Sequence, residues 1–420
     1  MTSAAAKPQK LKRRLSLTLV VLYGLGVTIG AGIYVLIGET AGKAGIYAPA
    51  SFVLAAVVMG FSAATFSEFV GRLPVSAGEA AYVRFGFGSH AGALLVGLIV
   101  MLAGIVSSAT ISLGSAGYLG AFLDPYVEIN RALLTVLIIV AVAAIACVGI
   151  LESVAFAGLM TIIEIGGLAA IVIGGFGGSP ELIARLPEVV PANLDAAIWS
   201  GVLGAGLLAF FAFIGFEDMV NVAEEVRNPQ RTMPRAIFIT LFLATILYFI
   251  VTSIAVLSVP LEELAATDAP LGLVFGAVTD LPPGLISGIA IIATFNGIVI
   301  QMIMASRVLY GLADQGTIPR QAGRFLGYVY GPTGTPVVAT ALIAFIVAVL
   351  ALNFEIARLA SITSQLILAV FVAVNLALIR VKWREKLGHG ERPSVLVFQV
   401  PMIVPVLGAA LSLALLVFGG

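Results

Sequence analysis

The sequence is poor in the residues that most enzymes use for chemistry. Among 420 residues there are one cysteine, two histidines and two tryptophans, and only 10% are charged. A single cysteine, Cys147, provides neither a disulfide framework nor a thiolate metal site. His90 and His389 lie far apart in the sequence, so neither a metal cluster nor a nucleophile with its base can be assembled. We therefore expect a protein that is not an enzyme and that holds no metal or cofactor.

Two further absences exclude other classes of protein. The formal net charge is zero, which argues against a nucleic-acid partner. The glycine-containing stretch Gly38-Glu39-Thr40-Ala41-Gly42-Lys43 lacks the spacing and the Ser or Thr of a phosphate-binding loop. Coupling to ATP hydrolysis within this chain is not expected.

Long apolar runs are abundant instead, since 60% of the residues are hydrophobic. The runs repeatedly reach the roughly 20 residues that cross about 30 Å of hydrocarbon as a helix. We place eleven spans near residues 16–37, 47–70, 88–121, 132–150, 153–177, 196–223, 234–258, 284–313, 336–353, 356–380 and 398–418. The sequence therefore predicts an all-α polytopic protein in a lipid bilayer.

Lysine and arginine indicate the orientation, because they are retained in cytoplasmic loops. They cluster at Lys7, Lys10, Lys12, Arg13 and Arg14, at Arg227, Arg231 and Arg235, and at Arg380, Lys382, Arg384, Lys386 and Arg392. The loop 259–284 on the opposite side has four acidic residues and no Lys or Arg. We expect residues 1–15 to be a cytoplasmic basic N-terminus and, with eleven spans, the C-terminus to be extracytoplasmic. The short loops fit a prokaryotic plasma membrane.

Two of the spans are interrupted by glycine at matching places, at residues 28–32 and 213–217. Broken helices in corresponding halves are a sequence indication of the substrate site of a secondary transporter. Five spans separate the breaks, which predicts an inverted repeat within a transport core at 16–380, with units at about 16–177 and 196–380. A cytoplasmic linker at 381–397 and an eleventh helix at 398–420 would follow. The alternative for the first break is that Gly26 and Gly30 form a helix-packing motif.

Specific segments resemble the amino acid–polyamine–organocation (APC) superfamily of permeases. The longest is Gly215-Phe216-Glu217 followed by Ala223-Glu224-Glu225-Val226-Arg227-Asn228-Pro229. Shorter ones are Gly26-Val27-Thr28-Ile29-Gly30, Arg72-Leu73-Pro74 and Ser306-Arg307-Val308-Leu309-Tyr310-Gly311. The resemblance implies a LeuT-like fold of five plus five helices, broken in helices 1 and 6, and alternating-access transport of amino acids. Gly78-Glu79 departs from the Gly-Gly of many relatives.

The breaks predict where an amino acid binds. Unwinding the first frees amide groups at a half-helix N-terminus, which favours a carboxylate. The expected donors are the Thr28 hydroxyl and the amides of Ile29, Gly30, Ala31 and Gly32. The second break exposes carbonyl groups suited to an ammonium, namely those of Phe213, Ile214 and Gly215. The resemblance to the family implies the same arrangement, with the carboxylate at the first break and the ammonium at the second. It also implies that Phe211 closes over the substrate as a gate.

Intramembrane carboxylates are the candidates for coupling, because an ionised one is costly and usually functional. Glu164 stands where the resembling family often has a lysine that replaces a sodium ion. It could carry a proton, ligate a cation, or act as a protonated structural hydrogen-bonding group. Glu217 matches a family glutamate implicated in coupling or gating, although a half-helix N-terminus also favours an acid.

Polar side chains on other spans are candidate liners of the pocket or of an ion site. They are Ser107, Ser108, Asn296, Ser361 and Ser364. The surrounding Phe, Gly and Ala residues suggest a neutral amino acid, moved by proton symport or by exchange, with sodium coupling left open. The alternatives are a polyamine or organic-amine transporter and a non-transporting amino-acid sensor. The sequence does not indicate an oligomeric state.

Overall fold

The computed structural model describes residues 15–74, 78–127, 129–148, 154–314, 320–389 and 397–419. Within these ranges the chain forms α-helices and short 3-10 helices. The long helices are α1 (Leu17–Ala44), α2 (Ala48–Arg72), α4 (His90–Leu123), α5 (Arg131–Val148), α6 (Val154–Gly178), α10 (Pro229–Ser258), α13 (Gly284–Asp314), α15 (Val337–Asn353), α16 (Ile356–Lys386) and α17 (Ile403–Phe418). The shorter ones are η1 (Gly45–Tyr47), α3 (Gly78–Phe87), α7 (Pro180–Arg185), η2 (Leu186–Val189), α8 (Ala196–Gly204), α9 (Gly206–Phe211), η3 (Glu217–Glu225), α11 (Leu261–Ala266), α12 (Pro270–Val278) and α14 (Arg320–Leu326).

The apolar runs have become helices, as expected. Seven stretches of the described chain are long and apolar enough to cross a membrane, and the first of them joins α1 and α2. Three shorter apolar helices lie at Ala196–Phe211, Val337–Asn353 and Ile403–Phe418. Each of the eleven predicted spans overlaps one of these helices, and the count of eleven crossings remains a prediction.

Local signals set several helix starts. The Ser89 hydroxyl accepts a hydrogen bond from the amide of Gly92 at the start of α4, at 3.0 Å, and the Asp195 carboxylate accepts one from Ala197 at the start of α8, at 2.8 Å. Such caps satisfy amides that have no partner within the helix. One end differs from the prediction: α16 continues to Lys386, so residues 381–386 of the expected linker are helical.

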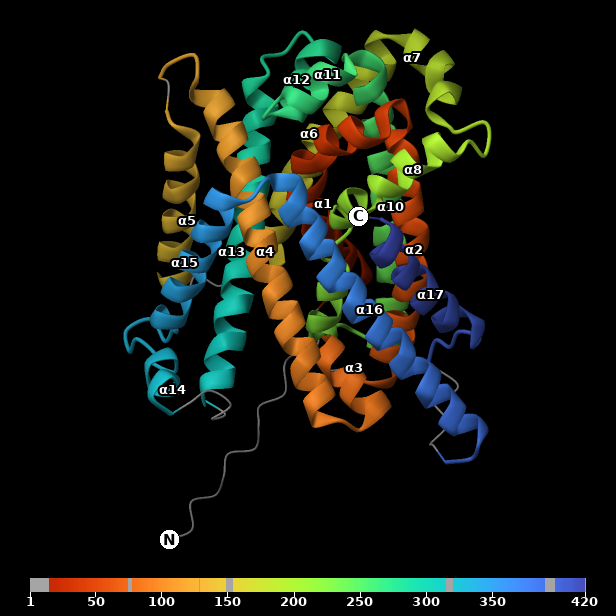
Figure 1. Ribbon diagram of the computed structural model, residues 1–420, viewed down its shortest axis with the longest axis vertical. Coiled ribbons are helices and arrows are strands. Elements are labelled where there is room, and N and C mark those ends of the chain that lie inside the picture. The colour runs from red at the N-terminus through yellow and green to blue at the C-terminus, as the bar shows by residue number, and fades with distance from the viewer. Residues whose placement is uncertain are drawn as a thin grey trace.

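The helices pack around α1, which lies inside the bundle (Figure 1). Helix α1 contacts α10, α6, α13 and α9, while α4 runs along α13 and α16 and α2 runs along α10 and α17. The short helices gather at the two ends: α7, α11 and α12 at one, α3 and α14 at the other (Figure 1). This arrangement places the centre of α1 between the two halves of the chain.

An ion-pair cluster joins three segments at the α3 end. The fully buried carboxylate of Glu68 on α2 pairs with Arg72 one turn later and with Lys382 on α16, the latter at 2.8 Å. It also accepts a hydrogen bond from the amide of Val400, at 2.8 Å. Arg72 pairs in turn with Glu385. The cluster therefore ties α2 to α16 and to the segment before α17.

Candidate functional site

The first helix break lies where the sequence predicts it. Within α1, Gly30 alone has non-helical angles, φ 2° and ψ −122°. The packing alternative holds for Gly26, where an added β-carbon would collide with the Thr161 side chain of α6. At Gly30 the same β-carbon would meet no atom within 4 Å. Gly30 therefore borders open space, which a helix-packing motif does not explain.

The second break separates α9 from η3. Helix α9 ends at Phe211, the amides of Ala212, Phe213 and Ile214 bond three residues back in tight turns, and η3 begins at Glu217. Gly215 has φ +121°, a conformation that side-chain-bearing residues rarely adopt. An added β-carbon there would lie 2.7 Å from the carbonyl oxygen of Val27 on α1. The two breaks are therefore in direct contact.

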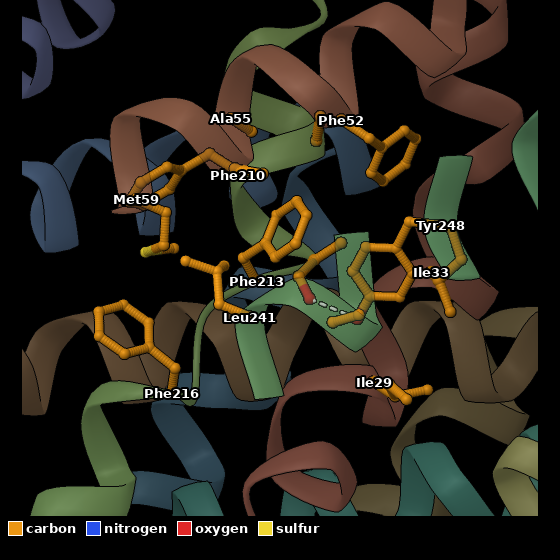
Figure 2. Close-up of a cluster of buried hydrophobic side chains, with 14 of the residues drawn as sticks. Ile29, Ile33, Phe52, Ala55, Met59, Phe210, Phe213, Phe216, Leu241 and Tyr248 are labelled. Carbon is orange, nitrogen blue, oxygen red and sulfur yellow. Dashed lines mark hydrogen bonds between the residues drawn. The ribbon is translucent and has the colours of Figure 1, made fainter. Parts of the chain in front are cut away.

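Tyr248 on α10 connects the backbones of both broken helices. Its hydroxyl lies 2.8 Å from the carbonyl oxygens of Thr28 and of Ala212, and shares its proton between them. Its ring packs edge-on against Phe213 and Phe52, with centroids 4.9 and 5.6 Å apart, in the buried aromatic cluster of Figure 2. One fully buried residue thus satisfies carbonyl groups that unwinding has released.

A cavity of about 500 Å³, part of it open, lies beside the first break, and we call it the break cavity. It is lined by Gly26, Val27, Thr28, Gly30, Ala31, Gly32, Ser107, Ile111, Phe211, Ile214, Ala293, Asn296, Gly297, Ile300 and Gln301. No charged side chain is among these described lining residues. The Thr28 hydroxyl is buried and has no hydrogen-bond partner in the described part of the chain. A ligand with an acceptor oxygen would satisfy it.

The predicted substrate residues divide into two groups. Thr28, Gly30, Ala31, Gly32 and Ile214 line the break cavity, as does the proposed gate Phe211. The other three, Ile29, Phe213 and Gly215, are not among its lining residues. Ile29 and Phe213 bury their side chains in the hydrophobic core. The Gly215 carbonyl accepts a hydrogen bond from the amide of Asp218, at 3.0 Å.

The candidate polar liners divide in the same way. Ser107 and Asn296 line the break cavity. The hydroxyls of Ser108 and Ser361 donate to carbonyl oxygens one turn back on their own helices, both at 2.8 Å. The Ser364 hydroxyl donates to the carbonyl of Leu207 on α9, at 2.6 Å. Ser108 and Ser361 therefore bond within their own helices, and Ser364 links α16 to α9. None of the three is among the lining residues of the break cavity.

Glu164 is on α6, which packs against α1, and it interacts with tyrosines of neighbouring helices. Its side chain is 1% exposed and lines neither cavity of the site. The Tyr34 hydroxyl donates to its main-chain carbonyl, at 2.8 Å, and the Tyr118 hydroxyl donates to the carbonyl of Tyr34, at 2.7 Å. Its carboxyl interacts electrostatically with Tyr34 and Tyr248. Glu164 therefore acts electrostatically on Tyr248, the residue whose hydroxyl bonds to the carbonyls of both breaks.

Glu217 borders a second cavity, of about 390 Å³, that we call the acidic cavity. One carboxylate oxygen of Glu217 accepts a hydrogen bond from the amide of Gly215, at 2.9 Å. The lining is Glu79, Val100, Ala103, Gly104, Ser107, Ile214, Glu217, Asp218, Gln301, Met304, Thr363, Ile367, Val370 and Phe371. Ser107, Ile214 and Gln301 line both cavities, so the two adjoin.

Sequence reasoning missed the tyrosines and Gln301. Tyr34, Tyr118 and Tyr248 sit in apolar runs without a local signal, because a buried tyrosine and a lipid-facing one look alike in a sequence. Glu79 was visible as a departure from the glycine of many relatives, but its partners come from distant segments.

Known proteins of several kinds are similar to this chain. A family model described as amino acid permease matches residues 14–419. The branched-chain amino acid permease BcaP of Bacillus subtilis is 28% identical over 90% of this chain and 83% of its own length. The methylthioribose transporter of Bacillus subtilis is 28% identical over 98% of this chain and 89% of its own length. The vacuolar cationic amino acid transporter 4 of Arabidopsis thaliana is 30% identical over 90% of this chain, which covers 64% of that protein.

A solved structure shares the fold. It is the substrate-bound outward-open state of a Na+-coupled sialic acid symporter, with a TM-score of 0.55 and 15% identity, covering 97% of this chain and 89% of that one. Together with the two breaks, this similarity confirms the LeuT-like fold.

Proposed function

The chain belongs to the amino acid permease family, and from this premise we propose that it is a secondary active transporter that moves neutral amino acids across the plasma membrane by alternating access. The observation that carries the proposal is the break cavity, which lies where two broken helices from corresponding halves of the chain touch. Substrate sites of such transporters lie at this junction.

An amino acid would bind the break cavity through its zwitterion. Its carboxylate would take the unpartnered hydroxyl of Thr28 and the amides that begin the second half of α1, from Ile29 to Gly32, where the helix dipole favours an anion. Its ammonium would face the carbonyls of the second break, at Phe213, Ile214 and Gly215, and of these Ile214 lines the cavity. The side chain of the substrate would point toward α4 and α13.

The lining supports a neutral substrate. Apolar side chains and glycine make up most of it, and the polar ones, Ser107, Asn296 and Gln301, are uncharged. A buried charged side chain of a substrate would need a partner of opposite charge, which this lining does not offer. Phe211, 4% exposed and at the end of α9, has the position and size to close over the bound molecule.

Proton coupling would run through Glu164. A carboxyl group inside a membrane span is costly and usually functional, and it can bind and release a proton as its surroundings change. Tyr248 links its neighbourhood to the carbonyls of Thr28 and Ala212, which must shift when the broken helices move. Glu217, bonded to the amide of Gly215, would sense the same movement from the other side.

The orientation follows from the basic loops. Arg227, Arg231, Arg380, Lys382 and Arg384 belong to loops or helix ends that we assign to the cytoplasm. The N-terminus then lies inside, as do α3 and α14, while α7, α11 and α12 face outside.

The test is uptake of a labelled amino-acid mixture into proteoliposomes with an inward proton gradient, an inward sodium gradient or neither. We expect accumulation with the proton gradient alone. Uptake only against internal amino acids would make the protein an exchanger. Uptake of amines in place of amino acids, or none at all, would contradict the proposal and favour the organic-amine or sensor alternative.

The position of the site is tested by Gly30→Leu. Because no atom lies within 4 Å of an added β-carbon, the leucine would enter the break cavity and displace the substrate. We expect amino-acid binding to be lost while the purified protein keeps its melting temperature. Gly288→Leu is the control, since Gly288 on α13 also has open space around it and lines neither cavity. Retained binding in Gly30→Leu would refute this placement of the substrate.

A further inference from the structure

The last turns of α16 present two different faces. The face toward the bundle carries Leu378, Val381, Lys382 and Glu385, at the i, i+3, i+4 and i+7 spacing that places residues on one side of a helix. Leu378 and Val381 are buried in the hydrophobic core. Lys382 and Glu385 form ion pairs with charged residues of α2. This face is therefore engaged within the protein.

The other face carries Arg380, Trp383, Arg384 and Leu387, at the same spacing. All four are exposed, Trp383 by 60% and Leu387 by 57%. Lys386, three residues after Trp383, is exposed as well. The ion pairs between described residues include none of these three basic side chains. Their positive charges therefore face outward.

The exposed face changes character along α16. Leu376, one turn before Arg380, is 45% exposed, and the next exposed positions are Arg380, Trp383 and Arg384. With 31 residues, α16 has a length of about 46 Å, whereas the hydrocarbon layer is about 30 Å thick. The helix therefore extends beyond the hydrocarbon. A tryptophan beside basic residues is typical of the level of the lipid headgroups.

Helix α3 lies against this part of α16. A β-carbon added to Gly86 of α3 would be 2.6 Å from the β-carbon of Ala377, so the two helices approach closely. Next to this contact, Arg380 lies over the ring of Phe87, 5.5 Å from its centroid. Arg84, three residues before Phe87 on α3, is exposed. We define the basic patch as Arg84, Arg380, Trp383, Arg384 and Lys386.

The helix dipole alone does not explain the basic patch. Basic residues in the last turn of a helix stabilise it, and Arg384 and Lys386 occupy that turn of α16. Arg380 lies more than a turn before the end, outside the range of this effect. The dipole also gives no reason for the exposed ring of Trp383 between the two arginines. Both features suit a membrane surface.

We propose that the basic patch binds the headgroup of an anionic phospholipid, in the leaflet that we assign to the cytoplasm. The guanidinium groups of Arg380 and Arg384 would donate hydrogen bonds to the phosphate oxygens, and Lys386 would add a positive charge. The ring of Trp383 would lie against the boundary between headgroup and acyl chains. The proposal goes beyond the proposed function, because it does not depend on what the chain transports.

The bound lipid would stabilise the folded protein. A ligand that binds only the folded state raises the melting temperature by mass action. The same two turns of α16 carry Lys382 and Glu385, which hold α2. An anionic lipid on the outer face would therefore keep the end of α16 in the position where these ion pairs form.

Trp383 can report on its own lipid surroundings. The chain has two tryptophans, and Trp199→Phe removes the other, whose indole donates to the carbonyl of Asn193 at 3.1 Å at the surface. This reporter protein is reconstituted into vesicles of phosphatidylcholine and phosphatidylglycerol in equal amounts. One of the two lipids at a time carries bromine, which quenches tryptophan fluorescence at short range. We expect brominated phosphatidylglycerol to quench Trp383 more strongly, and high salt to reduce the difference.

The charges are tested by combining Arg380→Gln, Arg384→Gln and Lys386→Gln in the reporter protein. The two brominated lipids should then quench Trp383 equally, and phosphatidylglycerol should no longer raise the melting temperature. A second variant combines Arg380→Lys and Arg384→Lys, which keeps the positive charges. It should keep the preference for phosphatidylglycerol, and it shows the effect of charge if the glutamine variant does not fold.

The matched control removes three exposed basic residues at the start of α10. It combines Arg227→Gln, Arg231→Gln and Arg235→Gln, so its net charge equals that of the glutamine variant of the patch. The preference for phosphatidylglycerol at Trp383 should persist in this control.

Three results would overturn the proposal. The first is equal quenching by the two lipids in the reporter protein. The second is a preference that survives the loss of all three charges at residues 380, 384 and 386. The third is a preference that the α10 control also loses, because net charge and not the basic patch would then attract the lipid. None of these measurements requires transport, so failure of the proposed function would leave this test intact.

Discussion

Gly215 lies so close to Val27 that a β-carbon on the glycine would be 2.7 Å from the valine carbonyl oxygen. The contact joins the second break to the first, although 187 residues (28 to 214) lie between the two in the sequence. A second close contact between the two breaks is at Gly32, where an added β-carbon would lie 3.0 Å from the β-carbon of Ala212. The broken segments therefore meet backbone to backbone, which only glycine permits.

Gly215→Ala should destabilise this junction. The methyl group would overlap the Val27 backbone, an overpacking that costs about 1–3 kcal/mol, and it would strain a backbone with φ +121°. We expect a lower melting temperature and weakened amino-acid binding. Gly288→Ala, where the β-carbon meets nothing within 4 Å, is the matched control. Equal melting temperatures for the two variants would contradict the close contact.

Tyr248→Phe should loosen the tie between the two breaks. The ring contacts with Phe52 and Phe213 would remain, but the carbonyls of Thr28 and Ala212 would lose their donor. A buried polar group left unsatisfied costs about 1–3 kcal/mol. Thermal unfolding should show this loss. Tyr126→Phe, at a tyrosine that is 82% exposed, should leave the melting temperature unchanged. A Tyr248→Phe variant as stable as wild type would show that these bonds do not hold the junction.

Glu164→Gln should uncouple transport from the proton gradient. The main-chain bond from Tyr34 would survive, because it is made to the carbonyl of residue 164 and not to its side chain. The amide cannot take up a proton, so accumulation in a pH gradient should fall to the level seen without a gradient. Glu181→Gln, at an exposed residue of α7, serves as the control. Undiminished accumulation by Glu164→Gln would remove this residue from the coupling mechanism.

Stability should depend on pH through Glu79. The pKa of this carboxyl rises from its ordinary value of 4.5 to about 8 on folding, so the folded protein favours the neutral form. Its stabilising contribution is full below pH 4.5 and is lost as the pH rises to about 8. Over this range the melting temperature of the wild type should fall further than that of Glu79→Gln. Parallel curves for the two proteins would show that folding does not shift this pKa.

The sequence alone determined the class of the protein and the places where its helices break. Apolar runs long enough to cross a bilayer are a local property, and they became the long helices because every backbone polar group in lipid needs a partner within the segment. Glycines at residues 30 and 215 predicted the breaks, which the backbone angles confirm. Periodicity could not predict the short helix α3, because it is only weakly apolar.

Only the tertiary structure decided which polar groups act together. Ser107 and Ser108 are neighbours in sequence, yet one lines both cavities and the other bonds to its own helix. Tyr248 meets both breaks from a helix whose sequence marks no polar face. Glu79 and Glu217 line the same cavity, although 137 residues (80 to 216) lie between them in the sequence. Burial in the folded protein raises the pKa of Glu79. Burial and long-range proximity are properties of packed helices, and no local pattern of residues encodes them.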